Sequence, residues 1–140
     1  MDMQTVKQII ANPYHDPADI VKFYLSRPQY LEEWLAAKGK ALAGVNIDCS
    51  ACVMSNYIAE KLTSEGFEVE RVEVTGTHVE VTMEECDLDI WHPEWVQRFI
   101  KAIDMHRNPD YPYSKNSKSK IFSGNLARNI LKATLAAGVE

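Results

Sequence analysis

The stretch Thr77-His78-Val79-Glu80-Val81-Thr82-Met83 decides the fold, because polar and apolar residues alternate along it without a break. A period of two is typical of a β-strand with one buried face. The segment Cys86-Asp87-Leu88-Asp89-Ile90-Trp91 repeats this alternation after a short turn at Glu84-Glu85. We therefore expect an antiparallel hairpin in which Met83 pairs with Cys86 and His78 pairs with Trp91.

The residues before this hairpin predict one more strand and a helix. Phe67, Val69, Val72 and Val74 indicate a strand, with a bulge where the alternation breaks at Glu70-Arg71. Upstream, Asp48 or Ser50 is expected to cap a helix that bears the cysteines, runs to about Ser64 and ends at Glu65-Gly66. This helix should pack on the three-stranded antiparallel sheet.

Further helices are predicted on both sides of this unit. The expected segments are a helix over 2–11, a helix from Asp16-Pro17 to Ser26, a helix from Arg27-Pro28 to Gly39, a connector or strand at 44–47, a helix opened by His92-Pro93, a polar loop at 108–120, and a helix capped by Ser123 that runs to about Ala137. The order predicts a single α+β domain over 1–140. Its helical N-terminal part is 1–44, its helix and sheet are 45–92, and its C-terminal helices are 93–140.

Composition indicates an ordinary globular protein. The chain has 140 residues, of which 46% are hydrophobic and 25% are charged. The net charge of −5 argues against nucleic acid or an anionic membrane as the main partner. The sequence has no apolar run of the roughly 18 residues that span a bilayer, and its first residues lack a signal-peptide core. We therefore predict a soluble, cytoplasmic protein.

Three residues predict thiol chemistry. A cysteine thiolate is stabilised by a helix N-terminus or by a nearby imidazolium, so Cys49, expected just after a helix cap, is a candidate nucleophile. His78, at the start of its strand, is the candidate base. In the expected register Asp89 lies diagonal to His78 on the same face and could orient the imidazole, and Asp87, one step further, is the alternative third residue.

The same segments carry a resemblance to a known family. Asp48-Cys49-Ser50-Ala51-Cys52-Val53 is similar to the Asp-Cys-Ser-Gly-Phe-Val type motif of bacterial cell-wall endopeptidases and amidases, and Thr77-His78-Val79 resembles their Gly-His-Val strand start. Over residues 45–92 the chain resembles the core of papain-like and transglutaminase-like cysteine enzymes. The resemblance departs from the motif at Ala51, which stands where the family has glycine.

This resemblance implies a fold and an activity. The fold would be papain-like, and the activity would be thiol-dependent hydrolysis or acyl transfer at an amide-type bond in a peptide or similar substrate, without a cofactor. Cys49 would attack, His78 would accept the proton, and a polar residue near Asp89 would hold the imidazole. The backbone amide of Cys49 would bind the oxyanion.

Two other hypotheses use the same part of the chain. Cys49-x-x-Cys52 before a helix resembles the heavy-metal-associated domain, in which two thiolates would bind a soft ion such as copper or zinc, with Cys86 or His78 as further ligands. A non-catalytic domain that binds a protein partner is the third hypothesis. Its candidate surface is aromatic, formed by Trp91-His92-Pro93-Glu94-Trp95 and by Tyr111-Pro112-Tyr113.

Overall fold

The computed structural model describes residues 16–46, 50–84, 86–106 and 120–138. Its first helix, α2 (Pro17–Leu25), begins where predicted, because the Asp16 carboxylate accepts a hydrogen bond of 2.9 Å from the amide of Ala18. Helix α3 (Pro28–Lys38) also begins at a proline and ends at Gly39. Gly39 has a φ of 57°, which favours glycine.

The centre of the fold is a three-stranded antiparallel sheet with the order β2-β3-β4. Its strands are β2 (Val69–Val74), β3 (His78–Met83) and β4 (Asp87–Trp91). The hairpin register is the expected one, since His78 pairs with Trp91 and the amide of Met83 donates to the carbonyl of Cys86 at 3.1 Å. The predicted bulge is confirmed as a register shift between Val69 and Arg71.

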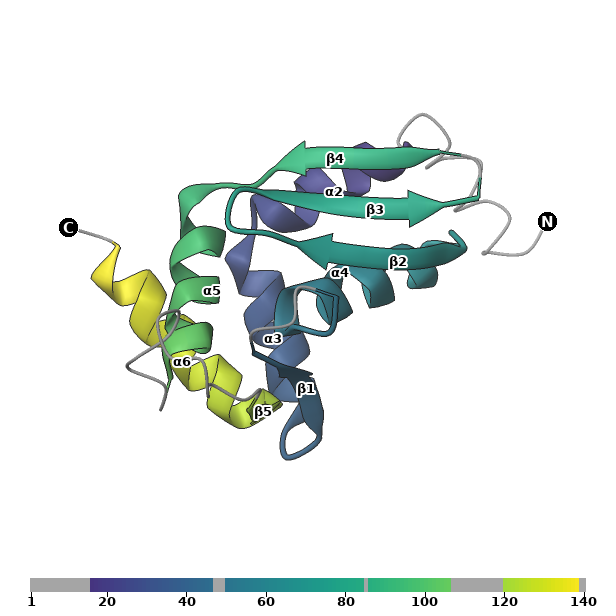
Figure 1. The fold of residues 1–140 in the computed structure, drawn as a ribbon. Helices are drawn as coiled ribbons and strands as arrows, with labels where there is room; N and C mark the ends of the chain where they lie inside the picture. Colours follow the sequence, from purple (N-terminus) through teal and green to yellow (C-terminus); the bar gives the residue numbers. More distant parts are fainter. Residues whose placement is uncertain (1–15, 47–49, 85, 107–119, 139–140) are drawn as a thin grey trace.

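Helices cover one face of this sheet and leave the other face open (Figure 1). Helix α4 (Val53–Ser64) packs against β2, and α2 packs against β4. The side chains directed at these helices are buried and apolar: Val72, Val74, Val79, Val81 and Ile90. Because β-strand side chains alternate between the two faces, His78, Glu80 and Asp89 lie on the open face.

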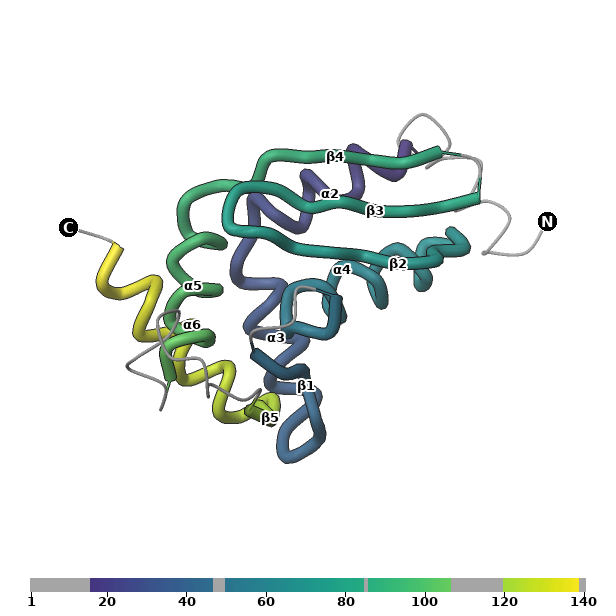
Figure 2. Tube along the Cα trace, in the orientation of Figure 1, coloured from purple at the N-terminus to yellow at the C-terminus, as the bar shows by residue number. Residues whose placement is uncertain are grey.

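A second, smaller sheet was not predicted. It pairs β1 (Leu42–Val45) with β5 (Ile121–Ser123), so that segments far apart in the sequence lie side by side (Figure 2). Helix α5 (Glu94–Met105) follows the main sheet, and α6 (Gly124–Ala137) begins at Ser123, whose hydroxyl accepts from the amide of Leu126 at 3.1 Å. The predicted mixed α+β class is thus confirmed.

The predicted start of the cysteine-bearing helix was wrong. Helix α4 has Cys52 as its N-cap, and neither Asp48 nor Ser50 caps it. The reason is that the carbonyl of Ala51 accepts a hydrogen bond from the amide of Val45 in β1, at 3.0 Å. This contact keeps Ala51 outside the helix, which begins after Cys52. The predicted helix over 2–11, and the loop over 108–120 except Lys120, lie outside the described residues. No helix in the described ranges is long and apolar enough to cross a membrane.

Candidate functional site

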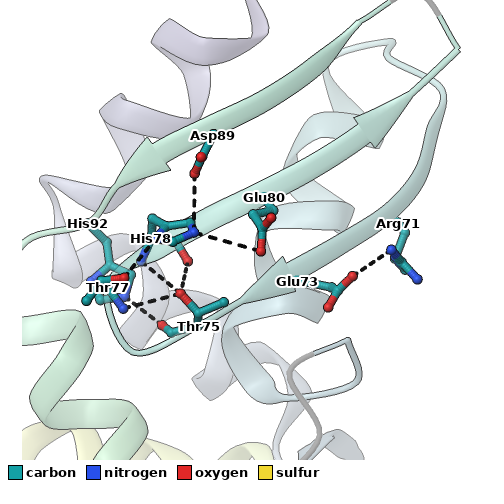
Figure 3. A network of polar contacts seen from close by, with 8 residues as sticks. All are labelled: Arg71, Glu73, Thr75, Thr77, His78, Glu80, Asp89 and His92. Atoms are coloured by element: carbon teal, nitrogen blue, oxygen red, sulfur yellow. Dashed lines mark hydrogen bonds and ion pairs between the residues drawn. The ribbon is translucent and has the colours of Figure 1, made fainter.

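His78 is the centre of a polar network on the open face of the sheet (Figure 3). It is the first residue of β3 and follows a turn in which the hydroxyl of Thr75 accepts from the amide of His78 at 3.1 Å. The side chain of His78 is 26% exposed, so the ring is partly covered but remains accessible. Trp91, its cross-strand partner, has its ring centroid 5.7 Å from the imidazole centroid. The ring of His78 is therefore restrained by neighbours on two strands.

Two carboxylates face the same nitrogen of this ring. Nε2 of His78 lies 3.4 Å from Oδ1 of Asp89 and 3.8 Å from Oε2 of Glu80. Asp89 reaches the ring from the diagonal position of the neighbouring strand, as the predicted register requires. Asp87 pairs with Thr82, further along the hairpin from His78. Of the two acids that were considered as the third residue, Asp89 is the one in contact with the imidazole.

The other ring nitrogen faces a hydroxyl. Nδ1 of His78 lies 2.8 Å from Oγ1 of Thr77. A carboxylate only accepts hydrogen bonds, so Asp89 and Glu80 favour the tautomer that carries its proton on Nε2. Nδ1 then has a lone pair, to which the hydroxyl of Thr77 can donate. The arrangement therefore leaves Nδ1 as the basic nitrogen of His78.

Sequence reasoning missed three residues of this network. Thr77 and Glu80 were not assigned a role, although Glu80 is two residues from His78 on one strand face. His92 was expected to open a helix and to belong to the aromatic partner surface, with no role beside His78. Its ring nitrogen Nε2 lies 2.9 Å from the carbonyl oxygen of Thr75, to which it can donate, and its amide donates to the carbonyl of Thr77 at 3.1 Å. His92 thus ties β4 to the turn that positions His78.

The candidate nucleophile, Cys49, lies outside the described residues. Because Cys52 is the N-cap of α4, Cys49 precedes the cap by three residues instead of occupying the first turn of the helix. The expectation that first-turn amides lower the pKa of the Cys49 thiol, and that its own amide belongs to the helix start, therefore rested on a wrong helix boundary.

Cys52 has the properties of a buried structural thiol. It is 7% exposed, and its Sγ accepts from the amide of Ser55 at 3.4 Å. Burial raises the pKa of the Cys52 thiol above its ordinary value. A thiol of this kind is a poor nucleophile at neutral pH.

The proposed metal ligands do not all lie together. Cys86 hydrogen bonds to Met83 at the far end of β3 from His78, and five residue steps along a strand span about 17 Å. Cys86 and His78 therefore cannot bind the same ion. Across the described parts of the chain, no group of three His, Cys, Asp or Glu side chains could hold a metal. A copper or zinc site at Cys49 and Cys52 remains a prediction, because Cys49 is outside these parts.

The aromatic residues proposed as a partner surface have different environments. Trp91 is 75% exposed and lies on the open sheet face. Trp95 packs against the core, and its Nε1 donates to the carbonyl of Leu25 at 2.7 Å, so it serves the fold. Tyr111 and Tyr113 lie outside the described residues.

Comparison with known proteins identifies no relative of this chain. The chain matched no family model, no curated protein and no solved structure. The site therefore has to be interpreted from its own residues.

Proposed function

We propose that this protein is a thiol-dependent hydrolase or acyltransferase that acts on an amide-type bond, with Cys49 as nucleophile, His78 as base and Asp89 as the residue that orients His78. The observation that carries the proposal is the placement of the imidazole between Asp89 at 3.4 Å and Thr77 at 2.8 Å. A base needs one nitrogen held and the other able to accept a proton: Asp89 holds Nε2, and Nδ1 takes the proton once the hydroxyl of Thr77 rotates away from it.

The chemistry follows from these roles. Cys49 transfers its thiol proton to Nδ1 of His78, and the sulfur attacks the carbonyl carbon of the substrate. The imidazolium returns the proton to the leaving amine as the C–N bond breaks, which leaves a thioester. Water, or another acceptor nucleophile, then gives its proton to His78 and displaces Cys49. Asp89 stabilises the imidazolium during both steps because its carboxylate lies beside Nε2.

Helix α4 packs on the covered face of the sheet and His78 lies on the open face, so this mechanism requires Cys49 to reach Nδ1 of His78 past the end of β3. Asn46, three residues before Cys49, makes two hydrogen bonds to the backbone of Lys120. Its side-chain Oδ1 accepts from the amide of Lys120 at 2.6 Å, and its own amide donates to the carbonyl of Lys120 at 3.1 Å. Ala51 is held on the other side by the amide of Val45. Asn46 and Ala51, two described residues on either side of Cys49, are thus each held by a hydrogen bond to β1 or to the residue before β5.

Competitive labelling of the three cysteines tests the proposal. Near neutral pH, iodoacetamide should modify Cys49 faster than buried Cys52 and faster than exposed Cys86, as measured by mass spectrometry of peptides. His78→Ala should slow modification of Cys49 alone. Asp89→Asn should also slow it, whereas Asp87→Asn is the matched control on the same strand face and should have no effect.

A second measurement separates catalysis from mere reactivity. A p-nitrophenyl ester should give a burst of p-nitrophenol equal to the enzyme concentration, and Cys49→Ala should abolish the burst. Modification of Cys49 at the rate of Cys86, together with no burst, would rule out the enzyme. Stoichiometric zinc or copper that is lost in Cys52→Ser would instead favour the metal site.

A protein-interaction function is the second candidate, and exposed Trp91 favours it. This residue stands on a face that also carries Glu80, Asp87 and Asp89, so a cationic peptide is the complementary partner. An Arg-Gly repeat peptide should then shift the indole resonance of Trp91 in an NMR spectrum. Such binding in a protein without any reactive thiol would favour this function over the enzyme.

A further inference from the structure

Thr75 links the turn between β2 and β3 to the backbone of His78. Its amide and its hydroxyl both donate to the carbonyl of His78, at 2.9 and 3.1 Å. Oγ1 of Thr75 in turn accepts from the amide of His78 at 3.1 Å and from the amide of Thr77 at 3.3 Å. These four hydrogen bonds fix the turn from which the imidazole of His78 projects.

The carbonyl of Thr75 has a partner of its own, the side chain of His92 (Figure 3). Nε2 of His92 lies 2.9 Å from this oxygen. A carbonyl oxygen only accepts, so Nε2 of His92 carries a proton and donates the hydrogen bond. The backbone amide of His92 donates to the carbonyl of Thr77 at 3.1 Å. His92, the residue after β4, therefore holds the turn at both of its ends.

The turn matters for His78 because it carries one of the two groups that orient the imidazole. The hydroxyl of Thr77 lies 2.8 Å from Nδ1, and Oδ1 of Asp89 lies 3.4 Å from Nε2. A ring held at both nitrogens keeps one orientation only while both neighbours stay in place. A displaced turn therefore releases the ring at Nδ1, the nitrogen assigned as the base.

We propose that His92 is a positioning residue for His78 and that it acts through the carbonyl of Thr75. This role rests on the proposed function, in which Nδ1 of His78 accepts the proton of Cys49. His92 takes no proton in that scheme. It restricts the positions that the turn can adopt, so that the imidazole meets the thiol in one arrangement.

Side-chain variants of His92 test this role. His92→Ala removes the hydrogen bond to Thr75 and leaves the backbone hydrogen bond to Thr77. The nuclear Overhauser contact between the rings of His78 and Trp91, whose centroids are 5.7 Å apart, should weaken in this variant. Modification of Cys49 by iodoacetamide should slow about tenfold, less than the roughly hundredfold that a 1 Å misplacement of a reacting group can cost. His92→Gln, whose side-chain amide can donate to the same carbonyl, should restore both the ring contact and the rate.

A control and a double variant separate positioning from general stability. Glu94→Gln, two residues further along, breaks the ion pair with Arg98 at 3.0 Å inside α5 and should change neither measurement. Thr75→Val should slow modification of Cys49, and adding His92→Ala should then slow it little further, because the turn is already released. An unchanged ring contact in His92→Ala, or no recovery in His92→Gln, would overturn the role of His92 even in an active enzyme.

Failure of the enzyme itself would look different. Cys49 that reacts no faster than exposed Cys86 would refute the thiol chemistry. The ring contact of His78 with Trp91 does not depend on any thiol, so it can be measured in either case. Its loss in His92→Ala would then still support the placement of His78 by His92, and its persistence would refute that placement.

Discussion

Nε2 of His78 lies 3.4 Å from Oδ1 of Asp89, across the hairpin formed by β3 and β4. The two residues are not direct cross-strand partners: His78 pairs with Trp91, and Asp89 pairs with Glu80. Their contact is the diagonal one, which long side chains on one sheet face can make. It gives the ring a defined orientation on a strand whose other face is entirely in the core.

The first prediction concerns the tautomer of His78. Asp89 and Glu80 face Nε2 and the hydroxyl of Thr77 faces Nδ1, so the neutral ring should carry its proton on Nε2. Long-range ¹H–¹⁵N NMR correlations distinguish the two tautomers directly. Thr77→Val should leave this tautomer in place and remove a donor from Nδ1, whereas Asp89→Asn should reduce its population. A ring with its proton on Nδ1 would contradict the assignment of Nδ1 as the base.

The second prediction concerns Tyr57, which is fully buried in α4. Its hydroxyl has no partner in the described part of the chain, so Tyr57→Phe should be neutral or should raise the free energy of unfolding by about 1 kcal/mol at pH 7. Chemical denaturation measures this change. Tyr30→Phe, at a residue that is 36% exposed, is the matched control and should have little effect.

Tyr57 and Cys52 should also make the free energy of unfolding depend on pH. Burial raises the pKa of Tyr57 above its ordinary value of 10.0, and it raises the pKa of the Cys52 thiol above 9.0. The unfolded chain therefore loses these protons first, so stability is full below pH 9 and falls as the pH rises through 9 and then 10. Tyr57→Phe should make the decline above pH 10 less steep. A decline that is equally steep in the variant would show that Tyr57 does not titrate differently on folding.

The third prediction concerns the contact of β1 with the start of α4. A Cβ added at Gly44 would stand 2.5 Å from the amide nitrogen of Val53 and 2.7 Å from the carbonyl carbon of Cys52. Backbone atoms cannot move aside cheaply, so Gly44→Ala should destabilise the fold by about 1–3 kcal/mol. Gly76→Ala, where nothing lies within 4 Å of the new carbon, is the control. Equal thermal midpoints for the two variants would mean that β1 and α4 do not touch as described.

The fourth prediction concerns Asn46, a fully buried polar residue at the end of β1. Its Nδ2 donates to the carbonyls of Ile103 at 3.3 Å and Asp104 at 3.4 Å, and its Oδ1 accepts from Lys120. Asn46→Ala removes these three hydrogen bonds and leaves a void at a fully buried position, so it should cost about 1–3 kcal/mol of unfolding free energy. Asn125→Ala, at an exposed position of α6, should cost much less. In the proposed enzyme, Asn46→Ala should also slow the labelling of Cys49.

Local signals predicted much of the fold because they act within a few residues. Asp16 and Ser123 accept hydrogen bonds at the helix starts where they were expected, and the alternation from His78 to Trp91 determines both the hairpin and its register. The pairing of β1 with β5 has no local signal. β5 is only three residues long, and its partner precedes it by more than seventy positions.

The sequence by itself determined the α+β class, the hairpin, and hence the closeness of His78 to Asp89, because side-chain alternation and turn position are properties of neighbouring residues. The tertiary structure decided where α4 begins, since Ala51 is drawn into hydrogen bonding with β1 and Cys52 becomes the cap. It also decided that Cys52 is buried and that His92 hydrogen bonds to Thr75 and Thr77 in the turn before His78. These outcomes depend on contacts between segments that are distant in the chain, and no local pattern encodes them.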